Sequence, residues 1–161
     1  MTEVTERSSL SEVDDQTDQL AIAIFSELFA ADQLARARLA KVLPKGMELS
    51  HFAVLNQLAR SGGERSPADL ARAFNVTRGA MTNTISKLEW AGYVHIRPDW
   101  DDARRKHISI SPSGTKARNA ALGAIAPILA DAVRDIGVDK VKSALPVIRA
   151  LRRQFTDEAT S

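Results

Sequence analysis

The chain of 161 residues contains no cysteine. This absence excludes disulfides, thiolate metal ligands, cysteine nucleophiles and regulation through cysteine oxidation. Histidine is scarce as well, since His51, His95 and His107 are the only three and none has the spacing of a motif such as HExxH. We therefore expect no metal site and no cofactor.

The sequence also lacks an uninterrupted apolar run of about 20 residues, the length that a membrane-spanning helix requires. Its N-terminus is acidic and has no basic segment ahead of an apolar one, so it does not match a secretory signal peptide. We expect a cytoplasmic protein with no membrane partner. The hydrophobic fraction of 44% is typical of a globular chain, and the length suits one domain with or without an oligomerisation element.

Charge is distributed unevenly along the chain, although the net charge is only +2. Residues 1–18 carry six acidic side chains and one basic one, whereas the remainder carries 21 basic against 14 acidic, or +7. A basic body is consistent with a polyanionic partner. It is equally consistent with a solubilising acidic leader attached to ordinary surface charge, and composition leaves both interpretations open.

Beyond an aperiodic N-terminal tail, helical periodicity is found toward both ends of the sequence. Residues 1–14 are polar and aperiodic, which predicts a disordered acidic tail. Residues 15–46 carry two neighbouring apolar stripes, a wider face than a small domain needs, so this helix is expected to pack against a second chain as well. Two more long amphipathic helices are predicted within residues 112–161.

Shorter elements are predicted between these long helices. Ser50, Ser66 and Thr77 are each suited to cap a helix, and so few residues separate the last two helices that their spacing is that of a helix-turn-helix. After these helices the apolar period changes to two over residues 93–97 and 107–110, which predicts two strands of a hairpin joined by a charged loop.

These elements together predict a mainly α fold with a small β-hairpin wing. Residues 47–111 would form a winged helix-turn-helix, with dimerisation arms at residues 15–46 and 112–161. The wide apolar faces of the arms are too large to be buried on so small a body. A two-fold symmetric dimer through the arms would cover them.

The helix that starts at Thr77 is the predicted recognition helix. Arginine can grip guanine, asparagine can pair with adenine, and short hydroxyl side chains can reach phosphates. Gly79, which has no side chain, would let the helix approach DNA closely. The candidates are Thr77, Arg78, Gly79, Thr82, Asn83, Ser86 and Lys87. Taken alone, the same residues could form an ordinary solvated helix face.

The predicted wing carries three consecutive basic residues, Arg104, Arg105 and Lys106, close to Asp102. A wing arginine can enter the minor groove, where negative potential concentrates, and a neighbouring carboxylate can orient it. The alternative is a surface hairpin that neutralises its own charge. The helix-turn-helix directly upstream favours DNA binding.

The segment from about Leu49 to Gly114 resembles the MarR family of bacterial transcriptional regulators. Three stretches carry the resemblance: LSHFAVLNQLA, SPADLARAFNVTRGAMTNTISKLEWAGYV and RPDWDDARRKHISISPSG. The wing of this family typically has an Asp-x-Arg-Arg pattern, then a strand, a Ser- or Thr-containing turn and a glycine. The residues at these positions are Asp102, Arg104, Arg105, Ser111 and Gly114. The arms match in length and type as well.

The resemblance implies a homodimer that binds a roughly palindromic operator in double-stranded DNA. The recognition helices would enter successive major grooves about 34–36 Å apart, with the wings in the flanking minor grooves. By the same likeness Arg104 would make the minor-groove contact and Asp102 would orient it. Many members of the family are repressors that release DNA when a small, often aromatic and anionic, effector binds beside the dimerisation arms.

A phenolic or carboxylate effector is therefore expected. The candidate lining residues are Phe25, Phe29 and His51. Each has a simpler alternative, since the two phenylalanines could belong to the core or the dimer interface and His51 could lie on the surface.

Two other classes of protein are alternatives to a DNA-binding regulator. An enzyme would need a positioned base with a nucleophile or a metal, and no such motif is present, so no catalytic residue is predicted. A winged-helix module could also bind a ligand or a protein without binding specific DNA. The basic residues on the predicted recognition helix and wing disfavour that alternative.

Overall fold

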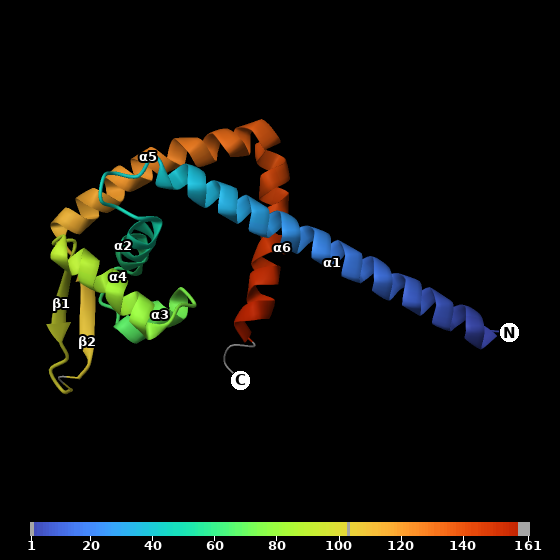
Figure 1. The fold of residues 1–161 in the computed structure, drawn as a ribbon, viewed down its shortest axis with the longest axis horizontal. Coiled ribbons are helices and arrows are strands. Elements are labelled where there is room, and N and C mark those ends of the chain that lie inside the picture. Colours follow the sequence, from blue (N-terminus) through green and yellow to red (C-terminus); the bar gives the residue numbers. More distant parts are fainter. Residues whose placement is uncertain (1, 103, 158–161) are drawn as a thin grey trace. The chain divides into compact units, whose positions relative to one another are not determined.

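The computed structural model describes residues 2–102 and 104–157, with side chains over 15–102 and 104–155. The chain divides into two compact units, Met1–Lys41 and Val42–Ser161. The first unit contains α1 (Thr2–Ala40). The second contains, in chain order, α2 (Leu49–Ser61), α3 (Pro67–Ala73), α4 (Arg78–Trp90), β1 (Val94–Pro98), β2 (Lys106–Ile110), α5 (Pro112–Ile136) and α6 (Val138–Asp157) (Figure 1). The predicted fold class, mainly helical with a two-stranded wing, is confirmed.

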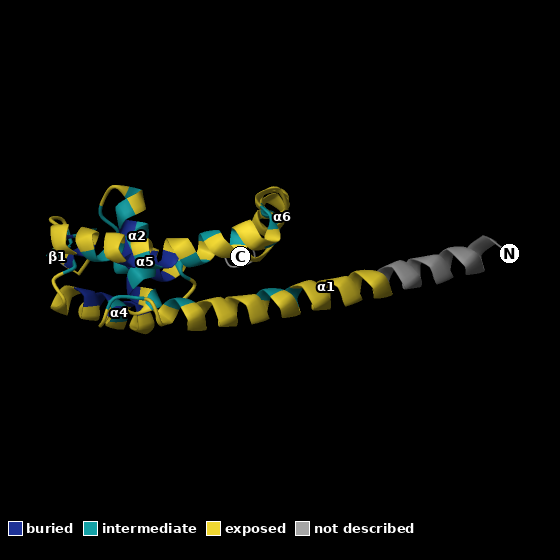
Figure 2. Cartoon of the chain, turned by 90° about the horizontal axis from the view of Figure 1, so that it is seen from above, coloured by how far each residue is buried: buried dark blue, intermediate teal, exposed yellow. Residues whose placement is uncertain are grey.

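Helix α1 starts at Thr2, ahead of the start at Asp15 that periodicity predicts. The described part of the helix is exposed along most of its length, including the apolar side chains Leu20, Phe29 and Leu34 (Figure 2). The side chains of residues 2–14 lie outside the described part of the structure. The division into an acidic tail and a dimerisation arm stays a prediction.

The hydrophobic core of the second unit lies where α2, α4 and α5 meet (Figure 2). Leu55 and Leu58 of α2 are almost completely buried, as are Leu70 of α3, Leu88 of α4 and Ile108 of β2. Each of these elements therefore contributes one apolar face to a single cluster. That cluster fixes the helix-turn-helix and the wing on the same body.

Capping residues set where the helices begin. Ser66 and Thr77 accept hydrogen bonds from backbone N–H groups of α3 and α4, as the sequence predicts. The predicted cap of α2, Ser50, is wrong, because the helix begins two residues earlier, at Leu49, and Glu48 occupies the N-cap position. The Glu48 side chain accepts from the His51 backbone N–H, and the His51 ring accepts from the Glu48 N–H in return. Such a reciprocal arrangement satisfies two otherwise unpaired backbone donors.

The wing is an antiparallel pair in which Val94 lies opposite Ile110 and Ile96 lies opposite Ile108. The connector between α2 and α3 joins this sheet through Arg65, whose backbone exchanges two hydrogen bonds with Ile108 at 2.9 and 3.0 Å. The wing is therefore attached to the helical body by backbone bonds as well as by its apolar face.

A close contact joins the wing to α5. Ser111 Oγ donates to the Gly92 carbonyl oxygen at 2.7 Å and accepts from the Gly114 N–H at 2.9 Å. A Cβ atom on Gly114 would lie 2.0 Å from the Tyr93 carbonyl oxygen, so this junction requires glycine. None of the described helices is long and apolar enough to cross a membrane.

Candidate nucleic-acid interface

Helices α3 and α4 form the predicted helix-turn-helix. The turn contains Asn75 with a φ of +50°, a conformation that asparagine tolerates better than most residues, and the Val76 N–H closes it onto the Ala71 carbonyl at 3.0 Å. Helix α4 buries Met81 and Ile85 together with Leu88. Its opposite face is therefore turned to solvent.

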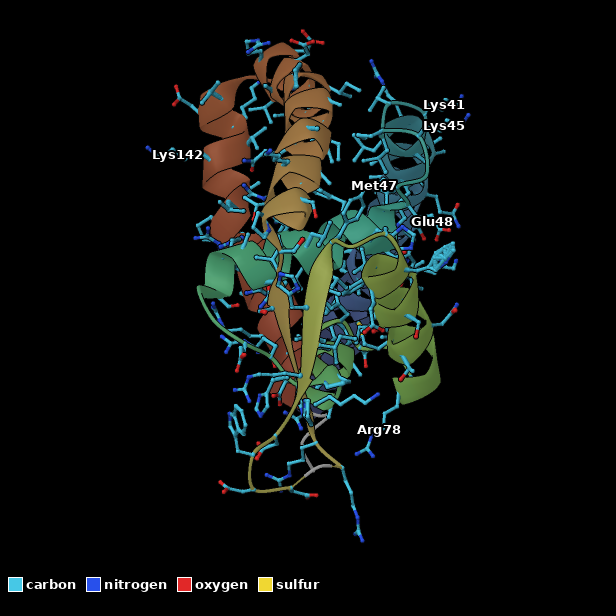
Figure 3. The ribbon with its side chains drawn as sticks, turned by 90° about the vertical axis from the view of Figure 1, so that its left-hand side faces the viewer. Lys41, Lys45, Met47, Glu48, Arg78 and Lys142 are labelled. Atoms are coloured by element: carbon cyan, nitrogen blue, oxygen red, sulfur yellow. The ribbon has the colours of Figure 1, made fainter. Side chains whose placement is uncertain are left out.

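All the candidates on the predicted recognition helix lie on that exposed side. The structure places every one of them in contact with solvent: Thr77, Arg78, Gly79, Thr82, Asn83, Ser86 and Lys87. A side chain at Gly79 would meet open space, so this position leaves room for an approaching surface. Figure 3 shows Arg78 and Glu48 at opposite ends of α4.

An open groove of about 710 Å³ brings α4 together with the wing and with the first turn of α3. Helix α4 contributes Arg78 and Thr82 to this groove. Its complete lining is Ser66, Pro67, Ala68, Asp69, Arg72, Arg78, Thr82, Asp99, Arg104, Arg105, Lys106 and His107. Five candidates from two separate segments of the sequence therefore face one concave, basic surface.

The groove has an excess of positive charge that is not neutralised locally. Asp69 pairs with Arg72 at 3.2 Å, and Asp99 is engaged by His107. Arg78, Arg104 and Lys106 make no ion pair with any residue that the structure describes. A polyanion would supply the missing counter-charge.

Asp102 shapes the wing loop through two contacts. Its Oδ1 atom accepts from the Arg104 backbone N–H at 3.0 Å, and its Oδ2 atom lies 3.8 Å from the Arg105 guanidinium. The predicted side-chain contact between Asp102 and Arg104 is not among the interactions of the described residues. Asp102 instead orders the backbone at Arg104 and leaves that guanidinium free to reach outward.

Lys87 is turned away from the groove. Its ammonium lies 3.2 Å from Glu48 Oε1 at the start of α2, and this hydrogen bond lowers the pKa of Glu48. Sequence reasoning also missed Arg72 and the first turn of α3 as parts of the groove. The Ser66-Pro67 cap locates that turn, but only the fold brings it beside the wing.

The base of the wing is braced by an ionic network that the sequence did not predict. Arg97 donates through Nε to Glu64 Oε1 at 2.7 Å and through Nη2 to Oε2, which raises the pKa of Arg97 and lowers that of Glu64. His107 Nε2 lies 2.7 Å from Asp99 Oδ2. Because an ionised carboxylate can only accept, the imidazole N–H donates. This bond, helped by the backbone N–H groups of residues 101 and 102, lowers the pKa of Asp99 to about 2.

We expect the Asp99 carboxyl group to titrate near pH 2, and its pKa to rise toward 3.8 when His107 is replaced by leucine. Since the folded pKa lies below the unfolded one, ionised Asp99 stabilises the wing above about pH 4 and this contribution is lost as the pH falls through about 2. Carboxyl carbon NMR measures both values, and His95→Leu serves as the control. An unchanged pKa in His107→Leu would assign the shift to the loop backbone alone.

His51, a candidate effector residue, is buried at 7% exposure instead of lying on the surface. Burial lowers its pKa, so the ring is held neutral. Nδ1 accepts from the Glu48 N–H at 3.1 Å, which places the proton on Nε2. The Nε2 atom is buried and has no hydrogen-bond partner in the described residues. A buried donor N–H without an acceptor lowers the stability of the fold.

The other two effector candidates lie on α1, in the first unit. Phe25 is half-buried and Phe29 is 67% exposed, with their ring centroids 6.2 Å apart. A role for them beside His51 stays a prediction. No group of three or more potential metal-ligating side chains occurs in the described residues.

The model of the MarR family matches residues 45–105, the segment that holds the helix-turn-helix and most of the wing. The HTH-type transcriptional regulator YdgG of Bacillus subtilis is 30% identical over 103 residues, which cover 63% of this chain and 68% of that protein. The chain belongs to the MarR family.

The MarR family is one of DNA-binding transcriptional regulators and not of enzymes, as the sequence predicts. A second MarR relative, the transcriptional activatory protein BadR of Rhodopseudomonas palustris, is 31% identical over 99 residues. That match covers 60% of this chain and 57% of BadR, so the chain spans little more than half of the relative's length.

The fold is also that of MarR itself. A crystal structure of a mutant MarR from E. coli in complex with operator DNA aligns with a TM-score of 0.71. The alignment covers 81% of this chain and 94% of that one, at 19% sequence identity. At this identity the likeness establishes the winged helix-turn-helix fold.

Proposed function

We propose that this protein is a homodimeric, sequence-specific regulator of transcription that binds a pseudo-palindromic operator in the cytoplasm. The observation that carries the proposal is the shared groove between α4 and the wing. Arg78 and Arg104 both line this groove, and neither has a carboxylate partner among the described residues. Helix α4 and the wing, which follow one another in the chain, thus present one positively charged surface.

The geometry of the groove suggests which groove of the DNA each element would contact. The first turns of α4 would enter the major groove, where Arg78 and Thr82 reach base edges or phosphates. The wing would follow the adjacent minor groove, with Arg104 inserted where negative potential is greatest. Asp102 supports this assignment, because it orders the Arg104 backbone while leaving the guanidinium unpaired.

The homodimer is supported by apolar side chains at the end of α5 and along α6. Ile136, Val138, Leu145 and Ile148 are between 41% and 60% exposed in the single chain. Contiguous exposed apolar surface of this kind marks an interface. A two-fold axis through these helices would set two α4 helices on half-sites about one DNA turn apart.

We further propose that the protein is a repressor and that a small aromatic anion releases it from DNA. The buried Nε2–H of His51 supports the effector site, because a phenolate or carboxylate oxygen is the acceptor that such a donor lacks. Phe25 and Phe29 of α1 stay candidates from the sequence for an apolar contact with such an effector.

Replacing Arg104 with alanine is expected to weaken operator binding by at least about 1 kcal/mol and to reduce the dependence on salt, because one DNA-directed charge is lost. The measurement is a salt titration on a labelled duplex from the region upstream of the protein's own gene, with random duplex as competitor. Lys142→Ala removes one charge from α6, at the far end of this unit from Arg78, and serves as the control (Figure 3). Equal affinity for both variants would count against the wing assignment.

The same assay tests the rest of the proposal. Binding that the random duplex competes away would favour a winged-helix module without specific DNA binding. Aromatic carboxylates added to the wild-type complex are expected to release the duplex, and His51→Phe, which lacks the donor, is expected to resist them. A complex that every such compound leaves intact would overturn the effector assignment.

A further inference from the structure

Trp100 in the wing loop is an aromatic side chain that the core does not use. It is 90% exposed, the most exposed of the large hydrophobic side chains in the described residues. A tryptophan side chain has roughly 150–250 Å² that water solvates poorly, so such exposure is unfavourable unless a partner covers it. The ring therefore does not serve to cover the hairpin.

The Trp100 ring is nevertheless held by a contact with the body of the protein. The Arg97 guanidinium lies over it, 6.0 Å from the ring centroid. Arg97 is in turn held by Glu64 on the connector between α2 and α3. This chain of contacts restrains the ring, so less side-chain entropy is lost when it meets a partner.

The backbone places Trp100 in the same loop as Arg104, the predicted minor-groove contact. Asp99 Oδ1 accepts from the Asp101 N–H at 2.8 Å, and the Asp99 N–H donates to the Arg105 carbonyl at 2.9 Å. The second bond joins the two ends of the loop that carries both Trp100 and Arg104. A duplex that receives Arg104 would therefore come close to the indole.

We infer that Trp100 is a further DNA-contacting residue, which packs against deoxyribose and base edges in the minor groove next to Arg104. The inference rests on the proposed function. Apolar side chains commonly pack in minor grooves, and the indole N–H can donate to the acceptors on base edges there. The contact would be tolerant of sequence, because the sugars present the same apolar surface along the duplex.

The surroundings of Trp100 favour a nucleic acid over a protein partner. Arg104, Arg105 and Lys106 share its loop or follow it, and the first and last of these have no carboxylate partner in the described residues. A protein interface excludes unpaired charge from around its aromatic anchors, whereas a DNA interface requires it.

The second tryptophan of the chain provides a matched control. Trp90 is 80% exposed, but it lies at the end of α4 beside Ser86, Lys87 and Ala91 and not in the wing loop. Trp90→Phe and Trp100→Phe are therefore two single-tryptophan proteins. With unlabelled upstream duplex, the emission of the protein that keeps Trp100 is expected to shift to shorter wavelength and to become less accessible to acrylamide. The protein that keeps Trp90 should change little.

Affinity gives an independent readout. Trp100→Ala is expected to weaken binding about fivefold or more without changing the dependence on salt, because no charge is removed. Trp100→Phe should recover most of the affinity, and circular dichroism confirms that each variant is folded. Normal binding of wild type with unchanged Trp100 emission would overturn this inference alone. Failure of wild type to bind any duplex would overturn the proposed function as well.

Discussion

Replacing Gly114 with alanine lowers the free energy of unfolding by an expected 3 kcal/mol or more, about 10 °C in Tm. The new Cβ would lie 2.0 Å from the Tyr93 carbonyl oxygen and 2.9 Å from the carbon of the same group. Both atoms belong to the backbone, so no side chain can rotate to make room. The wing and α5 would have to separate, and the Ser111 hydrogen bonds at this junction would be strained with them. Urea and thermal unfolding measure the loss.

The control for Gly114→Ala is Gly123→Ala in the same helix. A Cβ at Gly123 would meet no atom within 4 Å, and alanine favours a helix over glycine by about 0.5–1 kcal/mol. This variant is therefore expected to be as stable as wild type or slightly more stable. Equal melting temperatures for the two variants would mean that the junction relaxes without cost.

Replacing Leu145 with glutamate is expected to convert the dimer to a monomer. Leu145 is 41% exposed within the single chain, so the chain itself can fold with a charge at this position. In the proposed dimer the same carboxylate would be buried among apolar side chains with no partner, which an interface does not tolerate. Sedimentation velocity reports the change in mass.

Operator affinity should fall with the dimer, by about a hundredfold or more, because the two half-sites would no longer be bound by one linked molecule. Gln154→Glu adds the same charge to α6 about two and a half helical turns further on, and thus on the opposite face. That control should remain dimeric and bind normally. A stable dimer of the Leu145→Glu variant would place the interface elsewhere on the arms.

Local signals in the sequence predicted much of the fold. The cap at Thr77 and the apolar spacing of Met81, Ile85 and Leu88 located α4 and its solvent face. The alternation of Val94 and Ile96 located the first strand of the wing. These signals depend on neighbours within one helical turn or one strand. They can therefore be read from the sequence without knowledge of the tertiary fold.

Contacts between distant segments were not predictable in the same way. Lys87 was a candidate for DNA, yet it pairs with Glu48, 39 residues earlier in the chain. Likewise, Arg97 reaches Glu64 across a separation of 33 residues. Which exposed side chain finds which partner depends on how the elements pack, and no periodicity in the sequence encodes it.

Helix α2 and the connector that follows it contact both elements of the proposed DNA-binding surface. The first turn of α2 carries the buried His51 imidazole, and Glu48 at its N-cap holds Lys87 of α4. The last turn of α2 lies about 20 Å from its first turn. The connector that follows it is hydrogen-bonded to the wing through the Arg65 backbone. On the proposed function, a small tilt of this one helix would change the distance between α4 and the wing, and with it the fit to a DNA surface of fixed groove spacing.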